Sequence, residues 1–179
     1  MTKSQRLSRE ILWPLLGIAL VAVACAHPLW KIRSAQLTGD FLSHTFYLTF
    51  NIVGAVLVLW RAFRDGLKPL YWWPALAALF TFLCVEGLKQ ATRLPRPDGE
   101  PTGFPSGHTT LSFSVAGLLT QTYPRLAPLW YAAVISIGWS RVEGHAHFPY
   151  QVVTGAVIGT VISWTIGRLL PTVDKRVNP

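Results

Sequence analysis

The sequence predicts an all-α integral membrane protein, a polytopic helical bundle with about six transmembrane helices. Hydrophobic residues make up 51% of the 179 positions and charged residues only 13%, whereas an ordinary soluble domain carries roughly 25% charged residues. The apolar residues gather in six stretches near the roughly 17 to 25 residues that cross a bilayer as a helix. These stretches are 11–30, 42–60, 69–88, 108–123, 126–139 and 152–170.

The first stretch, 11–30, follows a basic N-terminal segment. This arrangement, together with Ala22-Val23-Ala24, also resembles a cleavable signal peptide. Because apolar residues continue toward Trp30, we favour an uncleaved anchor; cleavage would leave five spans in the same orientation.

The second and third stretches, 42–60 and 69–88, are long enough to span a bilayer. Glu86 lies inside the third stretch, close to its end. An unpaired carboxylate is costly in lipid, so we expect a basic partner such as Lys89.

The fourth and fifth stretches, 108–123 and 126–139, are short, and we expect them to extend into flanking residues or to lie where the bilayer is thinner. In the last stretch, Gly155 and Gly159 form a small-residue pair that favours close helix packing inside the bundle over dimerisation. No repeat or long linker divides the chain, so residues 1–179 are predicted to form one domain.

Lys and Arg residues are distributed unequally between the two sides of the predicted bundle. One side carries ten: Lys3, Arg6, Arg9, Arg61, Arg64, Lys68, Arg125, Arg168, Lys175 and Arg176. The other carries six: Lys31, Arg33, Lys89, Arg93, Arg96 and Arg141. Since cytoplasmic loops carry the excess of basic residues, both termini are predicted to be cytoplasmic.

The net charge of +8 does not indicate nucleic acid binding, because the basic residues lie between apolar runs and form no continuous face. The expected partner is the lipid bilayer. The sequence leaves the oligomeric state open.

Residues suited to phosphate chemistry lie in three segments, 89–97, 105–108 and 140–151, within the third and fifth loops. These loops share the predicted outer side of the membrane. The residues concerned are Lys89, Arg96-Pro97, Pro105-Ser106-Gly107-His108, Ser140-Arg141 and His147. The topology therefore predicts that they meet.

Three of these residues, Lys89, Arg96 and Arg141, are cations that suit a phosphate, and Arg can bind its oxygens in bidentate fashion. The alternative reading of Lys89, Arg93 and Arg96 is that they anchor the protein at lipid headgroups. The Pro-Ser-Gly-His segment favours the phosphate site.

In that segment, Ser106 is the expected N-cap of a helix whose first backbone amides would point at an anion. Gly107 would let the backbone approach closely. His108 and His147 then supply an acid and a nucleophile, the two groups that phosphoryl transfer requires beyond charge neutralisation. A lone histidine at a membrane boundary is more often an interfacial residue; two beside arginines favour catalysis.

The segments from residue 89 to about 151 resemble the three-part signature of the type 2 phosphatidic acid phosphatase superfamily. This superfamily includes bacterial phosphatidylglycerophosphate and undecaprenyl pyrophosphate phosphatases, and it shares its active site with vanadium haloperoxidases. The six-span layout extends the resemblance over nearly the whole chain.

The resemblance implies that His147 attacks phosphorus and becomes phosphorylated, while His108 protonates the departing oxygen. It further implies that the phosphoryl oxygens are held by Lys89, Arg96, Arg141, Ser106 and the Gly107 amide. No metal and no cofactor are implied.

One position departs from the family pattern: four residues after the nucleophile, the usual aspartate is Gln151. Its carbonyl can still accept a hydrogen bond from the imidazole ring, but it brings no charge. Glu143 would reach His147 if the segment between them were helical, or it is an ordinary interfacial glutamate. His145 fails the family spacing and is expected to line the pocket or the interface.

These observations predict a lipid phosphatase that hydrolyses a phosphomonoester or pyrophosphate of a lipid or isoprenoid. A phosphotransferase using the same intermediate, and a non-catalytic phospholipid-binding or transport protein, remain open alternatives. The site is expected to face the outside of a bacterial inner membrane. The sequence does not identify the lipid, because the pocket chemistry reads only the phosphate.

Overall fold

The computed structural model describes residues 3–26 and 41–171, and in these residues every regular element is a helix. Six α-helices are described: α1 Lys3–Ala26, α3 Tyr47–Asp65, α4 Trp73–Thr92, α5 Gly107–Thr122, α6 Ala127–Glu143 and α7 Pro149–Leu169. Three short turns of other helix types join or precede them: η1 Leu42–Phe46, η2 Lys68–Tyr71 and η3 Pro124–Leu126. The predicted all-α class is therefore confirmed.

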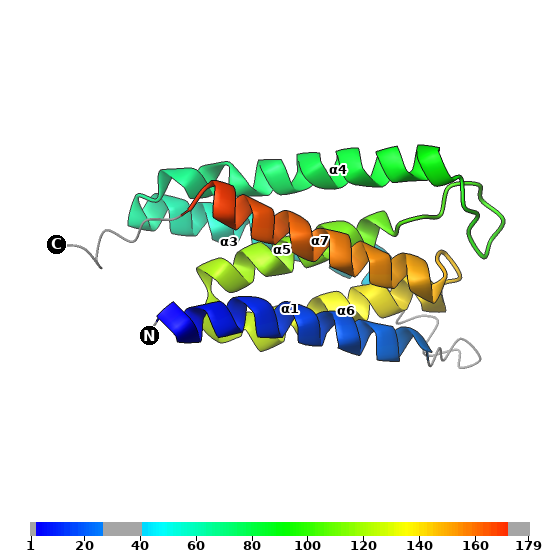
Figure 1. Ribbon diagram of the computed structural model, residues 1–179, viewed down its shortest axis with the longest axis horizontal. Coiled ribbons are helices and arrows are strands. Elements are labelled where there is room, and N and C mark those ends of the chain that lie inside the picture. The colour runs from blue at the N-terminus through cyan, green and yellow to red at the C-terminus, as the bar shows by residue number, and fades with distance from the viewer. Residues whose placement is uncertain (1–2, 27–40, 172–179) are drawn as a thin grey trace.

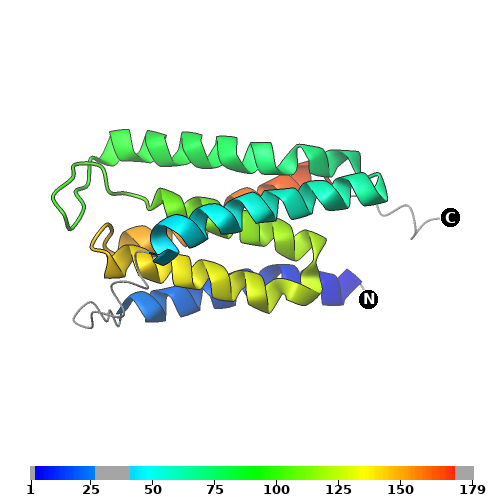
Figure 2. The same cartoon turned by 180° about the vertical axis from the view of Figure 1, so that it is seen from behind.

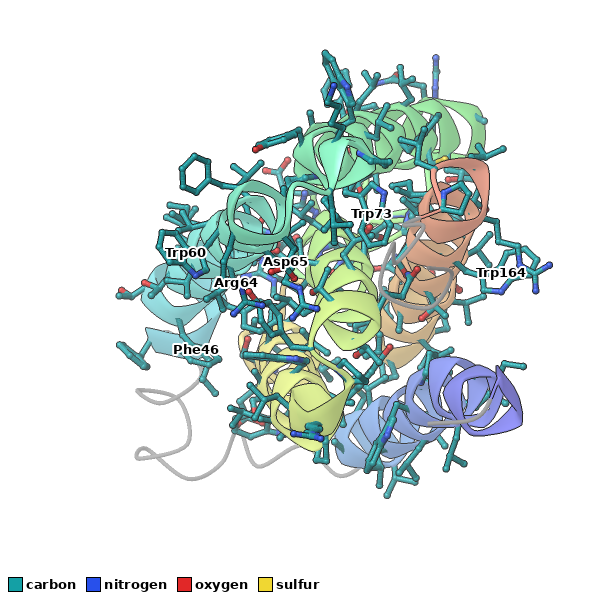
Figure 3. All side chains as sticks on the ribbon, turned by 90° about the vertical axis from the view of Figure 1, so that its left-hand side faces the viewer. Phe46, Trp60, Arg64, Asp65, Trp73 and Trp164 are labelled. Atoms are coloured by element: carbon teal, nitrogen blue, oxygen red, sulfur yellow. The ribbon has the colours of Figure 1, made fainter. Side chains whose placement is uncertain are left out.

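The helices run lengthwise beside one another, and α5 lies in the middle of the bundle (Figures 1 and 3). Nearly all of α5 is buried, including its serines and threonines. Thr120 and Thr122 donate their hydroxyls to backbone carbonyls one turn earlier, which satisfies these groups in an apolar setting. Protein therefore replaces lipid around α5, so a short and partly polar helix is stable there.

Helix α7 approaches α5 closely at the predicted pair of glycines. A Cβ at Gly155 would lie 2.7 Å from the carbonyl oxygen of Ser106, and one at Gly159 would lie 2.9 Å from the amide nitrogen of Ser114. Packing of this pair inside the bundle is thus confirmed.

Three helical segments are long and apolar enough to cross a membrane: His44–Asp65, Trp73–Thr92 and Pro149–Leu169. The apolar part of α1, Ile11–Ala26, is shorter. Large apolar side chains are exposed along the outer faces of these helices, among them Ile52 and Phe82. Such surfaces are stable in lipid and not in water.

All six predicted stretches correspond to helices, but several predicted ends are wrong. α3 continues past residue 60 because Asp65 pairs with Arg61 at 2.5 Å and with Arg64 at 2.8 Å, before Gly66 ends the helix at a φ of 65°. Figure 3 shows Arg64 and Asp65 at this end. α4 also extends beyond residue 88, and α7 begins before residue 152. The continuation of α6 to Glu143 agrees with the expected extension of the fifth stretch into flanking residues. The last predicted residues of the first stretch, 27–30, lie outside the described residues.

Four of the helix ends that carry the signature residues lie at one end of the bundle. α4 and α6 end there, α5 and α7 begin there, and α1 begins at the opposite end (Figure 1). Seen from behind, α3 also starts at the signature end (Figure 2). The fold thus gathers the segments that the sequence predicted to meet.

Candidate active site

Two hydrogen bonds connect the loop between α4 and α5 with the first turn of α7 at this end of the bundle. The amide of Ser106 donates to the carbonyl of Gln151 at 3.0 Å. In the opposite direction, the side-chain amide of Gln151 donates to the carbonyl of Pro95 at 2.9 Å. Two segments far apart in sequence are therefore tied together at residue 151.

His147 is held in the turn that follows α6. Its backbone amide and that of Ala146 donate to the carbonyl of Arg141, at 3.0 and 3.1 Å. His145, inside this turn, takes a left-handed φ of 53° and is exposed. The turn directs His147 inward, where it is 3% exposed.

The ring of His147 has a defined partner, since its Nδ1 lies 3.1 Å from Oε1 of Gln151. This oxygen also accepts the amide of Phe148 at 3.1 Å, while Nε2 of Gln151 donates to Pro95. The two faces of the amide group are therefore assigned by their partners. A carbonyl oxygen facing Nδ1 requires the proton on Nδ1, which leaves the lone pair on Nε2.

Burial lowers the pKa of His147 to about 4, and the charges of Arg141 and Arg96 act in the same direction. Contacts with Gln151 and with the backbone of Gly103 act against this shift. The imidazole is therefore neutral at neutral pH, which is the form that can act as a nucleophile.

This shift gives a testable pH dependence for the protein without substrate. In spectra of protein carrying ¹³C-labelled histidine, the ring signal that disappears in His147→Ala should titrate with a midpoint near pH 4. The midpoint lies below the ordinary histidine value of about 6.5 because the pKa is lowered. The ring therefore stays neutral as the pH falls through 6.5, and it gains its proton only near pH 4. A midpoint near 6.5 would contradict the buried, cation-flanked site.

Arg96 and Arg141 reach the site from different loops and carry unused donors. Within the described residues, the Nε atom of each is buried and has no hydrogen-bond partner. Buried polar groups are normally paired, and a buried cation without an anion is costly. The two guanidinium groups are therefore suited to an anion bound between them.

Gly103 lies between one of these arginines and the residue that contacts His147. A Cβ at Gly103 would lie 2.8 Å from Cγ of Arg96 and 2.8 Å from Nε2 of Gln151. Only a glycine leaves room for this close approach. Gly103 was not predicted from the sequence, because no pattern marks it.

His108 stands in the first turn of α5, within electrostatic range of Arg141, His147 and Arg96. One face of its ring packs against Tyr47, with 4.1 Å between the ring centroids. Tyr47 was not predicted from the sequence either, because it belongs to α3 and to none of the three predicted segments.

Ser106 occupies the expected N-cap position of α5, but its side chain makes no capping hydrogen bond. It is fully buried, and its hydroxyl accepts a hydrogen bond from Thr109 at 3.0 Å. At Gly107, an added Cβ would meet only a Val85 methyl group at 3.4 Å, so protein atoms do not require a glycine there. The first amides of α5 have no acceptor within the helix.

Lys89 forms an ion pair with Glu86 at 2.8 Å, so the expected partner of this carboxylate is confirmed. The ammonium group thus has one counter-ion already, unlike the Nε atoms of the two arginines. One of the two readings of Glu143 required a helical segment from Glu143 to His147, and this condition is not met, since α6 ends at Glu143. Glu143 is buried at that helix end.

The bundle has the apolar outer faces of a membrane protein. At one end it gathers two histidines and two arginines whose Nε atoms have no hydrogen-bond partner among the described residues. The family model described as the PAP2 superfamily matches residues 70–174. The chain belongs to this superfamily, and the predicted resemblance is confirmed. No solved structure shows significant similarity to the chain.

Several curated proteins are similar to parts of the chain. It is 33% identical over 70 residues to the bacitracin transport permease protein BcrC of Bacillus licheniformis, covering 37% of this chain and 34% of that protein. It is 27% identical over 128 residues to human glucose-6-phosphatase 3, covering 64% of this chain and 36% of that protein. The chain therefore spans about a third of the length of these two relatives.

A third relative is matched along most of its length. The probable diacylglycerol pyrophosphate phosphatase 1 of Schizosaccharomyces pombe is 24% identical, with 87% of this chain and 80% of that protein covered. This relative and the human one are both named as phosphatases.

Proposed function

We propose that the protein is a metal-independent membrane lipid phosphatase that hydrolyses a phosphomonoester or pyrophosphate of a lipid or isoprenoid through a phosphohistidine at His147. One observation carries the proposal. A buried neutral imidazole, its Nε2 lone pair left available by Gln151, lies within electrostatic range of two arginines with unpaired buried Nε atoms.

In the first step, Nε2 of His147 attacks phosphorus and the bond to the leaving oxygen breaks. The electron pair of that bond stays on the leaving oxygen, which takes a proton from His108. Arg96 and Arg141, with Lys89, Ser106 and the Gly107 amide, offset the charge of the five-coordinate transition state.

In the second step, water attacks the phosphohistidine. His108, now neutral, accepts a proton from this water, the P–N bond breaks, and inorganic phosphate leaves. His147 and His108 return to their starting protonation states, so no metal, oxidant or further co-reactant enters the balance.

The orientation in the membrane is part of the proposal. The excess of basic residues at the end opposite the site favours cytoplasmic termini and a site at the outer face of a bacterial inner membrane. An undecaprenyl pyrophosphate, a phosphatidylglycerophosphate or a phosphatidic acid would each present its phosphate there.

The substrate class is tested with purified protein in detergent and with chelator present. Phosphate release is measured from short-chain phosphatidic acid, phosphatidylglycerophosphate and an isoprenyl pyrophosphate, with His147→Ala as the control. We expect release from at least one substrate, and none from the variant. Equal release from the variant would refute the proposed nucleophile, and transfer to an added lipid acceptor in place of release would identify a phosphotransferase.

A non-catalytic phospholipid-binding or transport protein is the second candidate. Gln151 at the position of the family aspartate favours it, as does the description of the Bacillus relative as a transport permease. If this second candidate is right, the protein should bind lipid phosphates saturably and release no inorganic phosphate from any of the three substrates.

Gln151 is expected to orient the nucleophile, and its hydrogen bonds specify which replacements should fail. Gln151→Leu removes the acceptor for Nδ1 and should lower kcat by at least tenfold, and by up to the roughly 10⁴-fold seen when an orienting residue favours the wrong tautomer. Gln151→Glu keeps an acceptor of equal length but cannot donate to Pro95, so its loss should be smaller. The expected order of kcat is wild type, then Gln151→Glu, then Gln151→Leu. Steady-state kinetics of equally folded preparations measure it.

A shorter replacement should not improve this arrangement. Gln151→Asp would supply the charge usual in the family, yet it loses one methylene and the donor to the Pro95 carbonyl. A gain in turnover in this variant would indicate that charge outweighs the geometry. A Leu variant as active as the wild type would refute the orienting role.

A further inference from the structure

Tyr47 is the first residue of α3 and lies outside residues 70–174, which the family model matches. Its ring faces the ring of His108, with 4.1 Å between centroids and 42° between planes. This is a direct ring contact to the side chain proposed as the acid. Arg141 also lies within electrostatic range of Tyr47.

The start of α3 is fixed to α5 by a second contact one turn further along both helices. Asn51 donates through one nitrogen to the carbonyl of Tyr47 at 2.8 Å and to the hydroxyl of Ser112 at 3.1 Å. Asn51 follows Tyr47 by four residues, so both lie on one face of α3. Ser112 follows His108 by four residues, so both lie on the face of α5 that packs against it.

Further contacts hold the rest of α3 in this rotation. A Cβ at Gly54 would lie 2.5 Å from a methyl group of Val115, and the hydroxyl of Tyr123 donates to the carbonyl of Leu57 at 2.9 Å. On the other side, the short π-helix Leu42–Phe46 precedes Tyr47, whose amide donates to carbonyls within that segment. The Tyr47 ring is thus placed by the whole interface between α3 and α5.

The surroundings of His108 explain what such a ring contact can do. The groups within electrostatic range of His108 are Arg141, His147, His44 and Arg96. Each of them, when charged, repels a proton on His108, although an acid must carry one. The face of an aromatic ring carries negative partial charge and attracts a cation packed against it.

We propose that Tyr47 is a positioning residue that holds the ring of His108 toward the leaving oxygen and stabilises its protonated form. The inference rests on the proposed function, in which His108 gives its proton to the leaving oxygen as the bond to phosphorus breaks. Tyr47 forms no bond to the substrate. The aromatic ring of Tyr47 contacts His108. Tyr47→Phe keeps this ring and should therefore keep the stabilisation of protonated His108.

The test compares a substrate that needs an acid with one that does not. Short-chain phosphatidic acid releases an alkoxide-like oxygen, whereas 4-nitrophenyl phosphate releases a stable phenolate. General acids contribute roughly 10²–10⁴-fold, so Tyr47→Leu should lose about tenfold or more in kcat/KM on phosphatidic acid. On 4-nitrophenyl phosphate it should lose less than about threefold, and Tyr47→Phe should stay within about threefold on both.

Two further variants complete the design. Phe46→Leu removes the neighbouring aromatic ring, whose own ring contacts are Phe41 and Phe50, and should change neither activity. Tyr47→Met, which fills a similar volume with a flexible side chain, repeats the test if the Leu variant does not fold. It should show the same dependence on the leaving group.

Equal losses on both substrates, or no loss on either, would overturn the role of Tyr47. His108→Ala separates this failure from that of the proposed function. If His108→Ala shows the dependence on the leaving group and the Tyr47 variants do not, only the Tyr47 inference fails. If His108→Ala lowers kcat/KM, which reports the steps up to release of the leaving group, equally on both substrates, the acid assignment fails and the inference fails with it.

Discussion

His147→Ala is expected to lower kcat for lipid phosphate hydrolysis by about 10⁶-fold, the size of the loss seen when an enzyme with a covalent intermediate loses its nucleophile. Without the Nε2 lone pair, no covalent intermediate forms. Water would have to attack phosphorus directly, at a stage when His108 is still protonated and cannot act as its base. The remaining activity would come from the cations alone. Phosphate release by the purified variant measures the loss.

A matched control is available two residues away. His145 is exposed, and its left-handed φ of 53° is one that asparagine adopts more readily than most residues. His145→Asn should therefore retain activity within about threefold. If this control lost as much activity as His147→Ala, the assignment of the nucleophile by position would be wrong.

Arg141→Gln is expected to lower kcat/KM by about 10²–10³-fold, the usual loss when one donor to a transition-state oxyanion is removed. The side chain can be changed without releasing the nucleophile, because the turn that carries His147 is held by the backbone carbonyl of Arg141. The kcat/KM of Arg141→Lys should lie between those of the wild type and of Arg141→Gln, since lysine keeps the charge but not the paired donors. Kinetics and inhibition by vanadate measure the effect.

Arg93 offers the control for the removal of charge at this end of the bundle. It is exposed at the end of α4 with a left-handed φ of 48°. Arg93→Asn should change kcat/KM by less than about threefold, because an exposed charge is screened by solvent and salt. Equal losses in Arg93→Asn and Arg141→Gln would indicate a diffuse basic surface in place of a defined anion site.

The sequence predicted the helices and the gathering of the signature residues, since apolar stretches alternate with loops and alternate loops share one side. It predicted the helix ends less well. α3 continues past its apolar stretch because Arg61 and Arg64 pair with Asp65. Hydropathy does not register such pairs.

Contacts between distant segments lay beyond sequence reasoning. The bond from Gln151 to Pro95 joins residues 56 positions apart, and the ring contact of Tyr47 with His108 joins two helices. No local pattern encodes either contact. The reading in which Glu143 reaches His147 depended on helical spacing, and the structure does not provide that spacing because α6 ends at Glu143.

The phosphohistidine is tested most directly by trapping it. His108→Ala should still form the intermediate from 4-nitrophenyl phosphate, whose leaving group needs no acid, but should break it down slowly because the base for water is missing. The reaction is stopped in alkali, where phosphohistidine is stable, and the peptides are analysed by mass spectrometry. We predict phosphate on His147, whereas phosphate on another residue, or turnover without any phosphorylated peptide, would contradict the mechanism.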